Sequence, residues 1–257
     1  MRATRNRIGA QIMRIVSLVP SLTETLLECG ATVVGRTRYC IHPKNRIAGA
    51  RIVGGTKSAD WELIARLKPD LVVMDREENT REMAARCPHP MLTTSISGVG
   101  DVGPELQRLA EAVGSPALRE VAERWVQAAV LAPRNGDLAS LPGVVQWWNP
   151  PTIQDRLEYL IWRDPWLAIG QGTFIHSMLG MMASGAILPD HPEKYPAIKP
   201  GRLDPDRTLL LFSSEPYPFG RYRQQMLELG FACALVDGEK YSWFGLRSLE
   251  FLEDNLT

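Results

Sequence analysis

The chain has no long hydrophobic run and no excess of charge of either sign. None of its 257 residues lies in a stretch that approaches the ~18 apolar residues of a membrane-spanning helix, so no membrane span is expected. The 29 basic and 29 acidic residues balance, and no basic stripe stands out. Because nucleic acids and anionic membranes bind to positive surfaces, neither is expected as a main partner.

Cysteine and histidine are scarce and scattered. The four cysteines form no Cys-x-x-Cys pair, so they predict neither a zinc site nor a disulfide framework. Among the four histidines, His42 and His191 follow predicted strands or helices in different halves of the chain, and Asp190 adjoins the second. A metal site needs three or four converging ligands. We therefore expect neither a metal site nor an intrinsic cofactor.

Common catalytic and nucleotide-binding motifs are also missing. There is no Gly-x-Ser-x-Gly nucleophile motif. Gly55–Ser58 resembles the end of a phosphate-binding P-loop, but Thr56 separates the glycine from the lysine. Gly170–Gly172 precedes a predicted helix as a dinucleotide-binding motif does, but Ile175 occupies the position of the third glycine. The sequence therefore favours binding without catalysis.

Both halves of the chain contain the same order of structural signals. Each begins with an apolar strand followed by a proline, Ile15–Val19 in the first half and Leu157–Trp162 in the second. A helical pattern ending at Gly-Ala follows. A Leu-x-Pro-Asp turn then leads into a fully apolar strand, Leu71–Met74 or Leu209–Phe212. Helices alternating with such strands predict an α/β fold of two Rossmann-like lobes with mostly parallel sheets.

A long helical pattern separates the two halves. Apolar residues recur at helical spacing over residues 102–131, and the register largely continues through Gly114–Pro116. About 30 helical residues would span ~45 Å, which is the scale of a small domain. We predict an N-terminal α/β lobe over residues 13–100, a long bridging α-helix over 101–135 and a C-terminal α/β lobe over 136–257.

The first helix has a recognisable start at Ser21. Ser21–Glu24 fits a capping box, in which the serine accepts a backbone N–H and the glutamate reaches back to the serine. Gly30 has the residue type that commonly ends a helix. The sequence therefore predicts a helix that begins with a serine cap directly after the first strand.

Polar and aromatic residues gather where the predicted strands end. Ligands of open α/β sheets bind at the carboxyl ends of the strands, and a cleft between two lobes suits a small molecule. Tyr and Trp there offer an apolar face with a polar tip, which suits a large flat or macrocyclic ligand, although some will only anchor loops. The candidate ligand-binding residues are Ser21, Tyr39, Asp75, Arg76, Asp164, Trp166, Tyr195, Glu215, Trp243 and Phe244.

Three segments resemble one protein family. They are Arg14–Glu24 (RIVSLVPSLTE), Leu67–Val72 (LKPDLV) and Trp162–Trp166 (WRDPW), and their order is more specific than any one of them. They are similar to the helical-backbone, or class III, substrate-binding proteins of ABC importers, and most similar to the cobalamin-binding branch. The resemblance extends from Met13 to the C-terminus.

This resemblance implies two α/β lobes joined by one long helix, with a ligand held between them. Family members carry cobalamin, haem, siderophores or related metal chelates, so a corrinoid or another metal chelate is the expected ligand. In the cobalamin branch, a Trp-Pro loop matches Tyr195-Pro196 and a late Asp-Trp-Phe matches Ser242–Phe244. Asp75 replaces a tryptophan of that branch, so several positions that contact ligand differ.

The resemblance also implies an ABC permease as a docking partner, reached through one acidic residue on each lobe. Glu78 or Glu82 would serve in the first lobe, whereas residues 198–203 of the second offer Lys199 and Arg202 and no acid. The N-terminal arginines are not followed by the apolar segment of ~7–15 residues that a signal peptide needs. We expect the chain as written to be cytoplasmic, or periplasmic if its true start differs.

Two functions are consistent with these patterns. The first is non-catalytic binding of a cobalamin-like corrinoid or another metal chelate in the cleft between the lobes. The second is a cytoplasmic enzyme on the same scaffold that acts on a cofactor-like small molecule. Its polar participants would come from Asp75, Asp164, Glu215 or His191. Binding is preferred because function must be argued from the site, and no catalytic constellation is evident.

Overall fold

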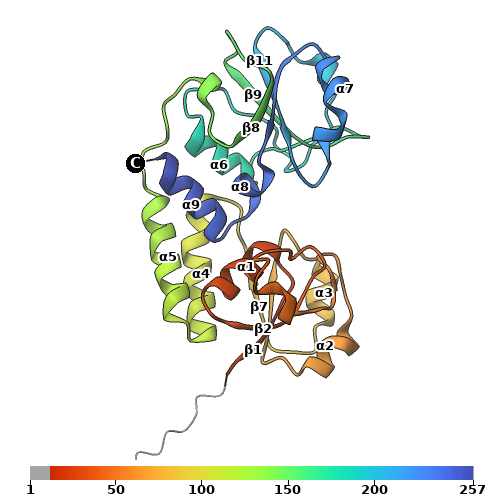
Figure 1. Cartoon of the computed structure of the whole chain (residues 1–257), viewed down its shortest axis with the longest axis vertical. Coiled ribbons are helices and arrows are strands. Elements are labelled where there is room, and N and C mark those ends of the chain that lie inside the picture. Colours follow the sequence, from red (N-terminus) through yellow and green to blue (C-terminus); the bar gives the residue numbers. More distant parts are fainter. Residues whose placement is uncertain (1–11, 257) are drawn as a thin grey trace, which may run out of the picture. The chain divides into compact units, whose positions relative to one another are not determined.

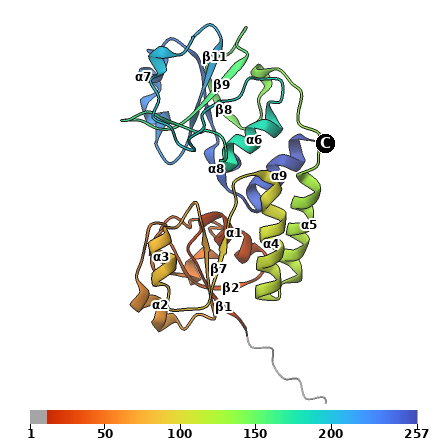
Figure 2. The same ribbon diagram turned by 180° about the vertical axis from the view of Figure 1, so that it is seen from behind.

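The structure, a computed structural model, describes residues 12–256, which form two units. Unit 1 contains the chain up to Thr94 together with Val113–Ser115, and unit 2 contains Ser95–Ala112 and the chain from Pro116 onward. Each unit is built on one five-stranded sheet with helices between its strands (Figures 1 and 2). The N-terminal arginines lie outside the described residues.

All five strands of the unit 1 sheet are parallel, in the order β3-β2-β1-β6-β7. Because they run in one direction, their carboxyl ends meet at one edge of the sheet. The strands are β1 (Arg14–Ser17), β2 (Thr32–Arg36), β3 (Arg51–Ile52), β6 (Leu71–Asp75) and β7 (Met91–Thr94), and a separate hairpin consists of β4 (Gly54–Gly55) and β5 (Ser58–Ala59).

Short helices pack on the unit 1 sheet. They are α1 (Pro20–Glu28), the 3₁₀ helix η1 (Ile47–Gly49), α2 (Trp61–Leu67) and α3 (Arg81–Arg86). Ile64 of α2 and Met83 of α3 join Val72 and Met74 of β6 in one hydrophobic cluster. Burial of this apolar surface is the main force that holds the helices against the sheet.

Helix α1 begins differently from the prediction. Pro20 occupies its first turn, and Val19 stands at the N-cap position without a side-chain hydrogen bond. The predicted serine cap is therefore wrong. Ser21 already lies inside the helix, because proline with its fixed φ and missing N–H suits the first helical position.

The unit 2 sheet has a parallel centre and antiparallel edges, in the order β10-β9-β11-β12-β8. Its strands are β8 (Val144–Asn149), β9 (Arg156–Trp162), β10 (Leu167–Ala168), β11 (Thr208–Ser213) and β12 (Ala232–Val236). Every residue of β11 is buried, as expected for a strand covered on both faces.

Helices make up much of the rest of unit 2. They are α4 (Val99–Val113), α5 (Pro116–Ala128), α6 (Phe174–Met182), α7 (Arg223–Leu227), α8 (Gly238–Ser242) and α9 (Leu246–Asn255), with 3₁₀ helices η2 (Leu138–Ser140), η3 (Pro200–Arg202) and η4 (Phe219–Tyr222). No described helix combines the length and apolarity needed to cross a membrane.

The predicted single bridging helix over residues 101–135 is wrong. Two helices, α4 and α5, occupy this segment and lie side by side (Figures 1 and 2). Gly114 has a φ of +65°, which ends α4, and Pro116 starts α5. The helices approach closely at Gly103, where a Cβ atom would lie 2.6 Å from the Cγ2 of Val126. The apolar pattern continues through the turn because both helices bury one face.

The two sheets repeat one strand pairing. In unit 1, β1 lies parallel to β6 with Ile15 opposite Leu71, and in unit 2, β9 lies parallel to β11 with Leu157 opposite Leu209. Each pair joins the first predicted strand of its half to the strand that follows the Leu-x-Pro-Asp turn. The predicted α/β fold with two mostly parallel sheets is confirmed.

Candidate functional site

Unit 1 has a hollow of about 600 Å³ at the carboxyl ends of β6 and β7. Its lining comes from these two strand ends and from the start of α3, and includes Asp75 and Arg76 from the predicted site. The lining residues are Met74, Asp75, Arg76, Asn79, Thr80, Arg81, Ala84 and Thr93. Its position matches the place where open α/β sheets bind ligands.

Asp75 shapes the loop after β6. The residue is 0% exposed, and its carboxylate accepts a hydrogen bond from the Thr94 hydroxyl (2.6 Å) and one from the backbone N–H of Glu77 (2.7 Å). These bonds connect the end of β6 to the end of β7. The carboxylate therefore supports the hollow from within.

Asn79 belongs to the same network and was absent from the residues predicted from sequence. It is 7% exposed, and its Oδ1 accepts the backbone N–H of Asp75 at 2.9 Å. Its Nδ2 donates to the carbonyl oxygens of Leu18 (3.2 Å) and Thr56 (2.8 Å). One side chain thus connects the segment after β1, the β4–β5 turn and the end of β6. The available signal was an asparagine in a polar turn between a buried strand and a helix.

Two other predicted residues of unit 1 lie outside the hollow. Ser21 is buried in α1, and its carbonyl accepts the hydroxyl of Thr25. Tyr39 is 54% exposed, and the Arg38 guanidinium lies 5.9 Å from its ring centroid. Only Asp75 and Arg76 of the four predicted residues in unit 1 line the same cavity.

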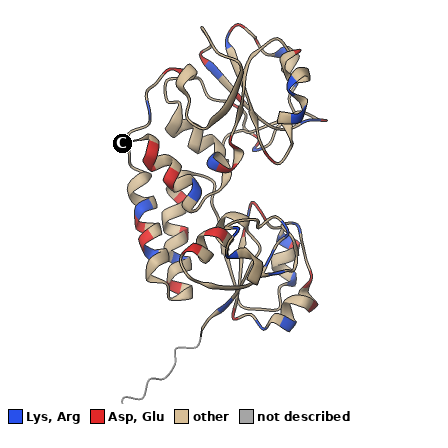
Figure 3. Ribbon diagram, viewed as in Figure 1, with Lys and Arg blue, Asp and Glu red and all other residues tan. Residues whose placement is uncertain are grey.

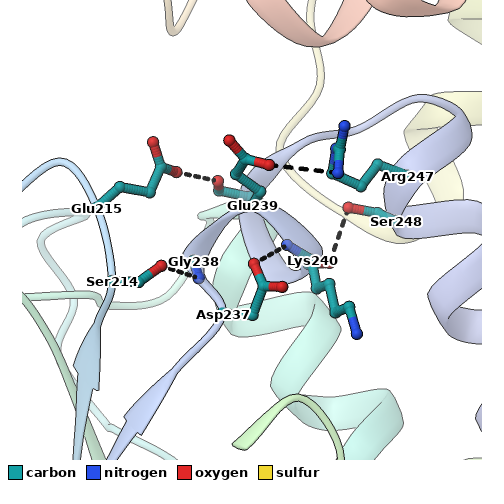
Figure 4. Close-up of polar contacts among 9 residues, drawn as sticks. Ser214, Glu215, Asp237, Gly238, Glu239, Lys240, Arg247 and Ser248 are labelled. Atoms are coloured by element: carbon teal, nitrogen blue, oxygen red, sulfur yellow. Dashed lines mark hydrogen bonds and ion pairs between the residues drawn. The ribbon is translucent and has the colours of Figure 1, made fainter. Parts of the chain in front are cut away.

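In unit 2, polar residues gather beyond β11 and β12 (Figure 4). The Ser242 hydroxyl donates to the Glu215 carboxylate at 3.1 Å, and the Trp243 side chain also hydrogen-bonds to it. Asp237 caps α8 by accepting the backbone N–H of Lys240, and Glu239 forms an ion pair with Arg247 at 3.3 Å. The structure thus brings together the predicted residues Glu215 and Trp243.

Burial raises the pKa of the Glu215 carboxyl above its ordinary value. Hydrogen bonds from Ser242 and Trp243 oppose the shift, whereas the nearby carboxylates of Glu239 and Asp237 add to it. Titratable groups with perturbed pKa values gather at functional sites, and this one stands at a strand end.

The predicted aromatic residues of unit 2 divide into two groups. Trp243 is 8% exposed and lies under the Arg247 guanidinium, and Phe244 is buried edge-on against Phe174. Both pack as loop anchors around α8. Trp166 is only partly buried, and its ring stacks on Phe219 with a centroid distance of 6.1 Å. Trp166 therefore keeps a surface that a ligand can reach.

Tyr195 lies on a loop attached to β10. The backbone N–H of Ala168 donates to Pro196, and that of Gly170 donates to Lys194 at 2.8 Å. Tyr195 is 42% exposed. Asp164 is exposed in the turn between β9 and β10, with a φ of +63°. Both residues lie outside the Glu215 network.

His191, on the same loop, pairs with a buried acid. Its Nε2 lies 3.0 Å from the Oε1 of Glu158 on β9. Burial raises the pKa of Glu158, and His191 and Arg156 oppose the shift. Within residues 12–256, no group of three or more His, Cys, Asp or Glu side chains is placed to hold a metal ion.

Solved structures share this fold. The periplasmic vitamin B12-binding protein BtuF of Vibrio cholerae matches over 95% of this chain and 94% of its own, with a TM-score of 0.63 and 16% identity. The periplasmic heme-binding protein RhuT from Roseiflexus sp. RS-1 matches over 94% and 95%, with a TM-score of 0.65 and 19% identity. IsdE of S. aureus, complexed with heme, matches over 94% and 96%, with a TM-score of 0.68 and 13% identity.

These matches show the fold of class III periplasmic binding proteins over 94–95% of the chain, at low identity. No protein-family model and no curated protein sequence matches the chain. The structural likeness therefore identifies the scaffold, and the ligand has to be argued from the side chains at the strand ends.

Proposed function

We propose that this chain is a non-catalytic binding protein for a cobalamin-like corrinoid or another metal chelate, such as haem or a siderophore. The main support is a scaffold that is shared with vitamin B12- and heme-binding proteins over 94–95% of the chain and that carries ligand-accessible groups. Unit 1 offers the hollow beside Arg76, and unit 2 offers Trp166 and Tyr195.

The accessible aromatic residues suit a large planar ligand. Trp166 is held by its stack on Phe219 and by the Arg163 guanidinium 5.5 Å from its ring, so little side-chain entropy is lost when a ligand packs on it. Tyr195 adds an exposed ring with a polar tip. Partly exposed aromatic side chains next to polar groups suit a tetrapyrrole or corrin ring.

Native mass spectrometry tests the proposal. Purified protein would be examined as isolated and after addition of cobalamin, cobinamide or haem, each in turn. We expect a 1:1 complex with at least one of them. If no adduct forms with any of the three, the proposed ligand class is wrong.

Paired tryptophan variants then locate the site. Trp166→Ala should weaken binding of the bound chelate by about tenfold, which corresponds to the ~1.4 kcal/mol expected from one lost aromatic contact. The control is Trp147→Ala, which replaces a partly buried tryptophan in the middle of β8. This variant should bind the chelate as the unmodified chain does. Equal affinity of both variants would contradict the placement.

One observation favours an enzyme as the second candidate. The raised pKa of Glu215 is a property of general acids and bases. The same incubations, followed by chromatography of the released chelate, decide between the functions. Recovery of unchanged chelate supports binding, whereas conversion that Glu215→Gln abolishes would support catalysis.

A further inference from the structure

The hollow in unit 1 is rich in hydrogen-bond donors. Arg76 follows β6, Arg81 begins α3, and both line the hollow. Among residues 12–256, neither guanidinium has an ion-pair or hydrogen-bond partner. Two other arginines of unit 1, Arg66 and Arg86, each pair with a glutamate four residues earlier in their helices. The hollow thus holds two positive charges without a paired acid.

The one acid in the lining does not cap these arginines. Asp75 is 0% exposed, and its oxygens accept hydrogen bonds from the Thr94 hydroxyl and the backbone N–H of Glu77. A buried carboxylate used in this way stiffens the loop that carries Arg76. Because this carboxylate does not pair with Arg76 or Arg81, their guanidinium groups can bind an acceptor on another molecule.

Hydroxyl groups add further donors. The Oγ1 of Thr80 accepts the backbone N–H of Met83, so its own O–H proton remains to be donated. Thr93 also lines the hollow. Guanidinium groups beside hydroxyls form the donor set that binds carboxylate and phosphate oxygens, often with two parallel hydrogen bonds.

The surrounding network fixes the backbone that carries Arg76. Asn79 connects the end of β6 to the carbonyls of Leu18 and Thr56, and the backbone N–H of Arg76 donates to the carbonyl of Thr94. A loop ordered before binding loses less entropy when it binds. The backbone at Arg76 is therefore set in place without a ligand.

We propose that the hollow is an oxyanion subsite in which Arg76 and Arg81 bind a carboxylate or phosphate group and Thr80 donates a third hydrogen bond. The inference rests on the proposed binding function for the source of that group, which we assign to a carboxylate of the bound chelate, a group that haem carries and that cobalamin and cobinamide lack. A volume of about 600 Å³ exceeds the needs of a single free anion and accommodates part of the molecule that carries it.

Isothermal titration with two simple probes tests the subsite. Citrate and inorganic phosphate would be added separately to the chelate-free protein and to Arg76→Ala, Arg81→Ala and the double variant. We expect saturable citrate binding that each single variant weakens about tenfold and the double variant abolishes. Arg81→Lys should lose part of the affinity, because lysine keeps the charge but not the planar pair of donors.

The control is Arg66→Ala, an exposed arginine of α2 outside the hollow, which should bind citrate as the unmodified chain does. Equal citrate affinity of the double variant and the unmodified chain would overturn the subsite. Arginine-dependent phosphate binding at least as tight as that of citrate would overturn the assignment to a chelate carboxylate. Circular dichroism of every variant confirms that the fold is retained.

The chelate titrations separate the two proposals. Arginine-dependent citrate binding without an adduct of cobalamin, cobinamide or haem would support the subsite and contradict the proposed function. Chelate binding that is equal in the double variant and the unmodified chain, with no citrate binding, would support the proposed function and overturn the subsite.

Discussion

The strand ends of the two units present different side chains although both sheets repeat the same strand pairing. In unit 1 the hollow presents Arg76 and Arg81, with its one acid buried. In unit 2, Glu215 and Glu239 gather beyond β11 and β12. Away from these ends, charges of both signs occur along the ribbon of each unit (Figure 3). The scaffold sets where the loops are, and their side chains set the chemistry.

The largest effect on stability is expected from replacing a core residue of unit 2. Trp125 is fully buried, its ring N–H donates to the carbonyl of Gly245, and its ring contacts Phe174 edge-on. Trp125→Ala should lower the free energy of unfolding by about 3–5 kcal/mol, because it leaves a cavity and an unpaired carbonyl.

Urea denaturation followed by hydrogen exchange measures this loss in each unit. Ile64→Ala, at a fully buried position of unit 1, is the matched variant, with an expected cost of about 2–5 kcal/mol. If the units unfold separately, each variant lowers the protection of backbone amides from hydrogen exchange only in its own unit. Equal loss of protection in both units from either variant would show that they unfold together.

Asn79→Ala should have the next largest effect, and only in unit 1. It leaves the carbonyls of Leu18 and Thr56 and the N–H of Asp75 without their partner, which should cost about 2–3 kcal/mol. Hydrogen exchange at the β4–β5 turn should accelerate. Asn45→Ala, at an exposed position of unit 1, should change stability by less than about 0.5 kcal/mol. Equal effects of the two variants would contradict the connecting role of Asn79.

A pH-dependent effect is expected in unit 2. Because burial raises the pKa of Glu215 in the folded state, its contribution to stability is fully present below its ordinary value of 4.5 and is lost as pH rises through the raised pKa. Glu215→Gln should therefore flatten the decrease in unfolding free energy from about pH 4.5 to neutral pH.

The measurement is urea denaturation over this pH range. Glu62→Gln, which removes an exposed carboxylate of α2 in unit 1, should leave the pH profile nearly unchanged. A profile of Glu215→Gln with the slope of the unmodified chain would show that the buried carboxylate does not control this pH dependence.

The smallest effect on stability is expected from Tyr195→Ala. The ring is exposed, and its loop is held by backbone hydrogen bonds, so stability should change by less than about 0.5 kcal/mol. Binding of the chelate found by native mass spectrometry should weaken. Lost stability with unchanged affinity would mean that Tyr195 is a loop anchor, as Phe244 is.

The sequence predicted the strands well because their signals are local. Apolar runs bounded by proline and glycine mark β1, β6, β9 and β11, and their order indicates parallel pairing. The turn between α4 and α5 was missed because the apolar register continues through it. The deciding features are the φ of Gly114 and the packing of Gly103 on Val126, which depend on tertiary structure.

The candidate site was less predictable for the same reason. Asp75, Arg76 and Glu215 were found because they lie at the end of a buried strand or within two residues after it. Asn79 was missed because its partners Leu18 and Thr56 are distant in sequence. The burial of Trp243 and Phe244 depends on contacts with other elements, and a loop position alone does not reveal it.

The base and the tip of the loop that carries Tyr195 differ in how many amino acids they can accept. At its base, a Cβ atom on Gly170 would lie 2.0 Å from the carbonyl oxygen of Glu193, so this position is closed to every other amino acid. At its tip, Pro192–Tyr195 are exposed. The main-chain carbonyls of Lys194 and Pro196, which any amino acid supplies, accept hydrogen bonds from the backbone N–H groups of Gly170 and Ala168. Mutation can therefore diversify the tip while selection preserves the base, which allows recognition to change without rebuilding the fold.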